Sequence, residues 1–169
     1  MGIVRKSIFW FVGLIFLQVT VLNNLDAGKW FFAYAYVLFI LMLPRNIPHW
    51  LLLLIAFALG SIVDLYAQTY GTHAFATTLV AFLRPNLLNS IAPSDSSTDS
   101  SFITVHLLGF QKFAVYASIM TLTHHLFVFF IDEFSFVSFF IVIGQVISST
   151  VVSLFAIFCL QFIFNKKGG

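Results

Sequence analysis

The sequence predicts an all-α, polytopic membrane helical bundle with about six transmembrane helices. Three observations support this fold class. First, 60% of the residues are hydrophobic and only 8% are charged, whereas soluble domains average about 25% charged residues. Second, uncharged runs long enough to span a bilayer recur along the chain. Third, seven of the eight Lys and Arg residues fall on one side of a membrane when these runs are threaded back and forth.

Each uncharged run is expected to form one helix, because about 20 apolar residues cross the hydrocarbon core. The first run follows Arg5 and Lys6 as in a signal peptide, but residues 23–26 lack the small-residue cleavage pattern, so we expect a retained helix. The second run is short and can span if Lys29 and Arg45 reach the two interfaces. If it is re-entrant, the bundle has five helices. The expected helices lie near residues 7–25, 29–44, 47–66, 71–88, 112–131 and 141–164.

The connections between these helices are mostly short. Pro44 and Pro48 predict a tight turn after the second run. Gly71 is expected to open the fourth helix. Residues 94–101 contain only Ser, Thr and Asp and cannot bury a core, which predicts a mobile cytoplasmic loop over 93–111. The chain is therefore expected to form a single membrane domain over residues 1–169.

The last uncharged run, residues 134–165, is too long for one ordinary span. Two arrangements remain open. Either an interfacial segment over 134–140 precedes a span near 141–164, or the whole run forms one long tilted helix. Ser149 and Ser153 in this run are interpreted as small packing residues.

The basic residues predict the orientation, because cytoplasmic loops of membrane proteins are enriched in Lys and Arg. With the N-terminus inside, only Lys29 lies outside, and both chain ends are cytoplasmic. The other seven basic residues are then at or near the cytoplasmic face: Arg5, Lys6, Arg45, Arg84, Lys112, Lys166 and Lys167.

Several function classes are disfavoured by composition and motifs. The net charge of +2 is too small to indicate nucleic-acid binding, and the single Cys159 cannot form a disulfide within the chain. No nucleophile elbow, phosphate-binding loop or HExxH motif is present. His124 and His125 are adjacent and point about 100° apart on a helix, unlike the i, i+4 pair of a zinc site. We therefore expect no catalytic, cofactor-binding or metal-ligating residues.

Polar residues inside apolar runs are the candidate structural or partner-binding sites, because they are costly in a bilayer. Asp64 lies near the outer end of the third expected helix. Ala56 and Gly60 share one helix face, which allows close helix approach. Two interpretations of Asp64 remain open: a buried carboxylate that fixes a helix contact or a ligand, or an interfacial residue within reach of water.

Five further polar or helix-bending residues are singled out. Gly71 permits a sharp turn, and His73 is interpreted as a structural hydrogen-bond partner that could pair with Asp64. At the inner end of the fourth helix, Pro85 is expected to kink or end the helix. Arg84 beside it is interpreted as an anchor whose side chain extends to the interface, where it can reach lipid phosphate. Gln18 in the first helix can hydrogen-bond across helices.

Three segments resemble the MreD family of bacterial rod-shape-determining membrane proteins. The first spans residues 58–65 and contains Gly60 and Asp64, the second spans 70–79 and contains Gly71 and His73, and the third spans 81–85 and ends with Arg84-Pro85. Gln-Val-Thr at residues 18–20 also resembles the start of the family. The His124-His125 pair followed by Asp132-Glu133 resembles its Bacteroidetes branch.

This resemblance implies a non-enzymatic scaffold in the bacterial inner membrane that docks MreC and supports side-wall peptidoglycan synthesis. It implies MreB, RodA and a class B penicillin-binding transpeptidase as further partners, besides membrane lipids. The family is similar in fold to the substrate-binding subunits of energy-coupling-factor transporters. The alternative function is therefore a vitamin-type small-molecule uptake subunit.

Overall fold

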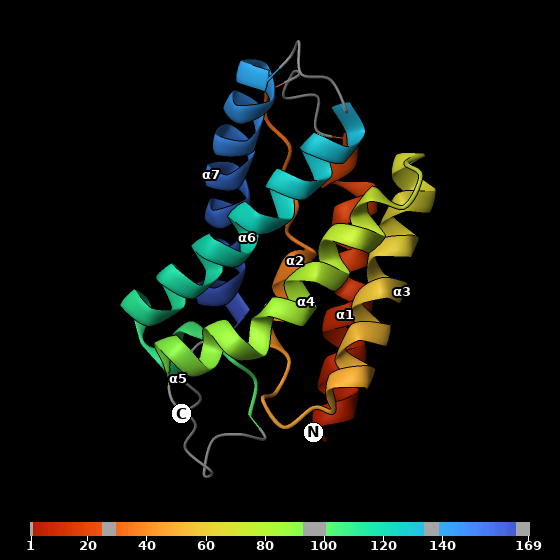
Figure 1. The fold of residues 1–169 in the computed structure, drawn as a ribbon. Coiled ribbons are helices and arrows are strands. Elements are labelled where there is room, and N and C mark those ends of the chain that lie inside the picture. The colour runs from red at the N-terminus through yellow and green to blue at the C-terminus, as the bar shows by residue number, and fades with distance from the viewer. Residues whose placement is uncertain (1, 25–29, 93–100, 134–138, 165–169) are drawn as a thin grey trace.

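The computed structural model describes residues 2–24, 30–92, 101–133 and 139–164, and within them every regular element is a helix (Figure 1). This confirms the all-α fold class. The elements are α1 (Ile3–Thr20), the 3-10 helix η1 (Leu22–Asn24), α2 (Val37–Met42), α3 (His49–Ala67), α4 (Thr72–Ile91), α5 (Val105–Leu108), α6 (Phe110–Glu133) and α7 (Phe139–Phe164).

Four helices of the described residues are long and apolar enough to cross a membrane, namely α1, α3, α6 and α7. The chain is therefore a multi-pass membrane protein by the length and composition of its helices. Large apolar side chains point outward from these helices, as a lipid-facing surface requires, among them Phe9, Phe57, Phe140, Val151 and Phe155. In Figure 1, α3 and α6 run from the lower to the upper end of the bundle and α4 and α7 run back, and the Ile3 end of α1 lies at the same end of the bundle as the Phe164 end of α7.

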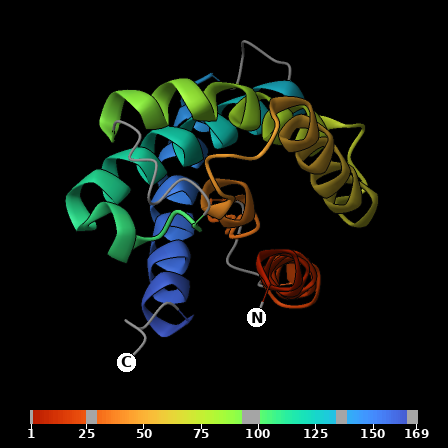
Figure 2. The ribbon, with the colours of Figure 1, turned by 90° about the horizontal axis from the view of Figure 1, so that it is seen from below.

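The prediction of a continuous helix over residues 29–44 is wrong. Within the described part of this range only the six residues Val37–Met42 are α-helical, and residues 31–34 carry no helix. All of the side chains over 35–43 are at most 2% exposed. Viewed along the bundle, α2 lies at its centre, with α1, α3, α4 and α7 around it (Figure 2). Non-helical backbone at membrane depth requires such enclosure, because lipid offers its polar groups no partner.

Small residues bring α3 and α4 into close contact, as the sequence predicts. A Cβ added at Gly60 would lie 2.5 Å from both the Ala74 Cα and the His73 carbonyl oxygen. Ala56, one helical turn earlier on the same face, is fully buried. Helix backbones approach this closely only where no side chain intervenes.

The loop expected over 93–111 is folded in its second half. Residues 93–100 lie outside the described residues, but residues 105–108 form the short helix α5. Ile103 is 1% exposed, and its N–H donates a hydrogen bond of 2.9 Å to the Met42 carbonyl oxygen. The apolar residues that follow the Ser/Asp run therefore cover the C-terminal end of α2.

The remaining expected helices agree with the structure to within a few residues. Pro85 lies inside α4, which continues to Ile91, so the helix does not end at this proline. In the last run, α7 begins at Phe139, and the interfacial segment considered over 134–140 falls mostly on 134–138, outside the described residues.

Candidate functional site

Asp64 caps the start of α4 from the neighbouring helix α3. Its carboxylate accepts backbone hydrogen bonds from His73 N–H at 3.0 Å and Ala74 N–H at 2.8 Å, and side-chain bonds from Thr69 and Thr72. Asp64 is 6% exposed. An anion at this position satisfies donors that have no partner within the helix and complements its dipole. Of the two interpretations of Asp64, the buried carboxylate that fixes a helix contact is the one observed.

The turn between α3 and α4 depends on two left-handed residues. Gln68 has φ 57° and ends α3, and Gly71 has φ 90° and precedes α4. A residue with a Cβ is strained at the Gly71 conformation. This turn returns the chain so that Thr72, His73 and Ala74 face the Asp64 carboxylate.

The Tyr36 hydroxyl is the centre of a buried polar network. It lies 2.9 Å from His73 Nδ1 and 2.7 Å from His124 Nε2, and the Thr77 hydroxyl donates to it at 3.4 Å. A hydroxyl has one proton, so it donates to one histidine and accepts from the N–H of the other. Tyr36, His73 and His124 are each at most 1% exposed. The network therefore joins the central segment, residues 30–43 with the short helix α2, to α4 and α6.

His125 contacts the central segment through the Tyr34 ring and α7 through the Ser153 hydroxyl. Its Nδ1 lies 2.8 Å from the Thr121 carbonyl oxygen, and its Nε2 lies 3.0 Å from the Ser153 hydroxyl of α7. The Tyr34 ring packs against His125 with their centroids 5.2 Å apart, and against His73 at 4.9 Å. These contacts fix α6 against α7 and against the central segment.

Side chains of α1 and α7 satisfy the backbone of the non-helical residues. Phe32 N–H donates to the Ser149 hydroxyl at 3.0 Å, and Tyr34 N–H donates to the Ser153 hydroxyl at 2.8 Å. From the opposite side, Gln18 Nε2 donates to the Ala33 carbonyl oxygen at 2.9 Å. Ser149 and Ser153 therefore act as hydrogen-bond partners and not only as the small packing residues that the sequence suggested.

Arg84 is buried and does not extend to the interface. It is 1% exposed, its Nε donates to the Tyr116 hydroxyl at 3.0 Å, and its Nη2 donates to the Leu43 carbonyl oxygen. The Tyr116 hydroxyl in turn donates to the Leu41 carbonyl oxygen at 3.2 Å. The last carbonyls of a helix lack intrahelical partners and attract cations. Arg84 and Tyr116 thus cap the C-terminal end of α2, which is why this arginine does not reach lipid.

Among the hollows lined by described residues, three lie at different places on the bundle. An upper cavity of about 800 Å³ is lined by polar and aromatic side chains, including Tyr34, Tyr66, Thr69, His73 and Asp132. An apolar groove of about 540 Å³ lies between α1 and α3, with Phe11, Phe39, Ile55 and Ala58 in its walls. A small lower pocket of about 180 Å³ is lined by Arg45, His49, Arg84 and Asn89, among others.

The chain matches no family model, no curated protein and no solved structure. Among the residues that the structure describes, no three His, Cys, Asp or Glu side chains are grouped so that they could hold a metal ion.

The structure brings five of the eleven predicted residues to one central segment. Gln18, His73, His124, Ser149 and Ser153 all contact residues 32–36, directly or through the Tyr36 hydroxyl. Four other predicted residues determine the contact between α3 and α4, next to the central segment: Ala56, Gly60, Asp64 and Gly71. The small residues Ala56, Gly60, Ser149 and Ser153 are all buried inside the bundle, where they pack against other helices of the same chain.

Sequence reasoning missed the residues at the centre of the network. The sequence pattern presents Tyr34 and Tyr36 only as part of an apolar run, it marks neither Thr77 nor Tyr116, and it includes His125 only in the His124-His125 pair of the family resemblance. The spacing of Phe32, Tyr34 and Tyr36 contains the missed signal, because a period of two is typical of extended backbone.

Proposed function

We propose that this protein is a non-enzymatic scaffold of the MreD type in the bacterial inner membrane. In this role it holds MreC and supports side-wall peptidoglycan synthesis together with MreB, RodA and a class B penicillin-binding transpeptidase. The motifs that resemble the family now have structural roles that suit a scaffold. Gly60 and Asp64 fix α4 against α3, and His73 and His124 fix the central segment.

The apolar groove beside α1 is the observation that carries the proposal. Among the α1 side chains that the structure describes, only Leu14 and Gln18 are buried, so this helix presents most of its surface outward. Figure 2 shows α1 set to one side of the other helices. A transmembrane helix inserts ridges of side chains into such grooves. We propose that a membrane-spanning helix of MreC occupies this groove.

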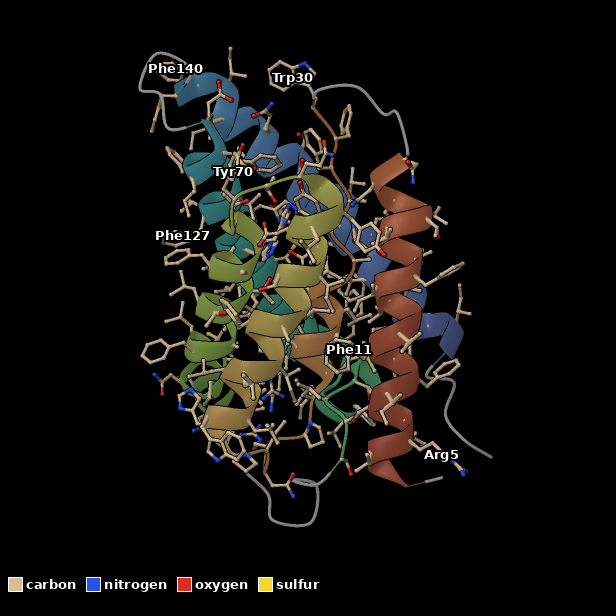
Figure 3. All side chains as sticks on the ribbon, turned by 90° about the vertical axis from the view of Figure 1, so that its right-hand side faces the viewer. Arg5, Phe11, Trp30, Tyr70, Phe127 and Phe140 are labelled. Atoms are coloured by element: carbon tan, nitrogen blue, oxygen red, sulfur yellow. The ribbon has the colours of Figure 1, made fainter. Side chains whose placement is uncertain are left out.

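The proposed topology has six crossings, with both chain ends in the cytoplasm. The α4 helix and the central segment would add two crossings to the four apolar helices. Arg5 is labelled at the lower end of the bundle in Figure 3, and Arg45 lies at the same end, in the connection that leads from α2 to the start of α3. Positive charge favours the cytoplasmic side. This distribution of charge supports the proposal that the lower end faces the cytoplasm.

Co-purification with a matched pair of variants tests the scaffold role. Ala58→Trp fills the groove, and Leu54→Trp adds the same side chain to an exposed site on the same helix that does not line it. We expect tagged wild-type protein and the Leu54 variant to recover MreC, and the Ala58 variant to recover much less. Depletion of the protein should turn rod-shaped cells into spheres. Equal recovery of MreC with both variants, or rods that persist after depletion, would argue against the scaffold.

The upper cavity favours a second candidate, the vitamin-type uptake subunit. Its volume of about 800 Å³ lies in the range of small-molecule sites, and its walls combine aromatic rings with Asp132, His73 and Thr69. Equilibrium binding of radiolabelled vitamins to the purified protein separates the two candidates. Tight, stoichiometric binding without recovery of MreC would favour the transporter subunit, and no binding with recovery of MreC would favour the scaffold.

A further inference from the structure

The upper cavity has a negatively charged wall. Among its described lining residues one side chain carries a formal charge, the exposed carboxylate of Asp132 at the end of α6. The next residue, Glu133, adds a second negative charge at the same end of the helix. The segment 25–29 contains one acid, Asp26, and one base, Lys29, so it adds no net charge to this end of the chain. The cavity therefore favours a cation over an anion.

Two buried polar atoms in the wall are available to a ligand. His73 lines the cavity and is 1% exposed, and its Nδ1 lies 2.9 Å from the Tyr36 hydroxyl, so Nε2 is the ring nitrogen left for the cavity. Tyr34 lines the same cavity and is 9% exposed. Within the part of the chain that the structure describes, neither His73 Nε2 nor the Tyr34 hydroxyl forms a hydrogen bond. Polar atoms at buried sites are costly without a partner, which points to a polar group of a ligand.

The Tyr34 side chain brings the acid and the imidazole to one region of the cavity. Its ring packs edge-on against His73, with the centroids 4.9 Å apart. Its hydroxyl is close enough to the Asp132 carboxylate for the two groups to interact electrostatically. The Phe32 ring stacks on Tyr34 with the centroids 6.3 Å apart. A carboxylate, an imidazole nitrogen and a hydroxyl are therefore grouped beside aromatic rings.

This group of side chains has the chemistry that recognises a primary ammonium. An ammonium donates three hydrogen bonds and accepts none, and a carboxylate, a hydroxyl oxygen and a neutral imidazole nitrogen all accept. A neutral His73 that donates from Nδ1 to the Tyr36 hydroxyl has its lone pair at Nε2. The bond from an ammonium to Asp132 is charge-assisted, and the faces of aromatic rings also attract a cation.

The size of the cavity indicates that the ammonium belongs to a larger organic molecule. A volume of about 800 Å³ is far more than an ammonium group fills, and it lies in the range of sites for small organic ligands. The apolar part of such a ligand can pack against the rings of Phe31, Phe32 and Tyr66, which also line the cavity.

We propose that the upper cavity binds an organic molecule through its primary ammonium group, which is held by Asp132, His73 and Tyr34. The proposal rests on the cavity of the second candidate function and specifies the class of its ligand, but it does not require transport. It is independent of the MreC groove, because the described residues that line the cavity and those that line the groove are different.

The test uses purified full-length protein in detergent and phenethylamine as the probe. Equilibrium dialysis measures the binding of radiolabelled phenethylamine and its displacement by unlabelled analogues. Phenethyl alcohol has the same ring and chain without the charge, phenylacetate has a negative charge, and the trimethylammonium analogue has the positive charge without N–H donors. We expect saturable binding that only the primary amine displaces efficiently. Absence of saturable binding, or equal displacement by any of the three analogues, would overturn the proposal.

Three variants show whether the cavity is responsible. Asp132→Asn should weaken phenethylamine binding about tenfold, because the charge-assisted hydrogen bond is lost. Tyr34→Phe keeps the ring and removes only the hydroxyl, and it should weaken binding about threefold. Glu133→Gln removes the adjacent charge, which does not line the cavity, and should leave affinity within about twofold of wild type. An equal loss in the Asp132 and Glu133 variants would overturn the proposal, because general surface charge would then explain the binding.

Two parallel measurements separate this proposal from the proposed functions. The Asp132→Asn variant should recover MreC as well as the wild-type protein does, because the carboxylate lies outside the groove. Tight binding of a vitamin without an ammonium group, together with no binding of phenethylamine, would overturn the ligand class proposed here and leave the uptake subunit as a candidate.

Discussion

The Asp64 carboxylate accepts a hydrogen bond of 2.8 Å from the backbone N–H of Ala74, so α3 supplies the cap of α4. Next to this contact, Gly60 allows the two backbones to touch. The cap and the close approach reinforce each other, because the carboxylate can reach the helix start only when the helices are this close.

Replacing Asp64 with Asn should destabilise the protein by about 1–2 kcal/mol, because a neutral amide is a weaker acceptor for the N–H groups of His73 and Ala74. The midpoint of thermal unfolding in detergent measures this loss. Glu133→Gln is the matched control, since it neutralises an exposed acid at the end of α6. An Asp64→Asn midpoint equal to that of the control would mean that the cap contributes nothing to stability.

Gly60→Ala should cost about 1–3 kcal/mol, because the added methyl group would overlap the α4 backbone at Ala74. Gly13→Ala is the control, because a Cβ at this position of α1 meets nothing within 4 Å. It should therefore cause no loss. The same unfolding measurement compares the two variants, and a similar effect of both would refute the close approach of α3 and α4.

Ser153→Ala should destabilise the protein by about 0.6–3 kcal/mol, because the buried N–H of Tyr34 loses its acceptor and His125 loses a partner. Ser90→Ala is a suitable control, since the Ser90 hydroxyl bonds only within its own helix at an exposed site. If the Ser153 variant unfolded at the temperature of the Ser90 variant, the serine would serve only as a small packing residue.

The two ends of the bundle should differ in access from outside the cell. In a Cys159→Ala background, Tyr70→Cys places a thiol in the α3–α4 turn at the upper end, and Ser101→Cys places one before α5 at the lower end. A membrane-impermeant thiol reagent added to intact cells should label position 70 and not position 101. Labelling of position 101 from outside would reverse the proposed orientation.

Local sequence signals predicted the α3–α4 pair well. Gly60, Asp64 and Gly71 lie within twelve residues of one another. The contact between α3 and α4 is therefore local in the sequence, and the spacing of these residues is enough to predict it. Composition likewise predicted the apolar helices, because a helix that spans a bilayer needs about 20 predominantly apolar residues.

The central segment could not be predicted in the same way. An uncharged run does not distinguish a helix from extended backbone when distant side chains provide the hydrogen bonds. The partners of Phe32 and Tyr34 are Ser149 and Ser153, separated from them by 117 and 119 residues. The burial of Arg84 could not be predicted for the same reason. Its hydrogen-bond partner, the Leu43 carbonyl oxygen, is distant in the sequence.

Photo-cross-linking within the membrane tests the scaffold role most directly. A benzophenone amino acid is placed at Ala58, in the groove between α1 and α3, and in a second variant at Leu54, outside the groove on the same helix. Irradiation of intact cells should give an adduct with MreC from position 58 and little from position 54. No MreC adduct from position 58, or equal adducts from both positions, would contradict the proposal that this groove holds MreC.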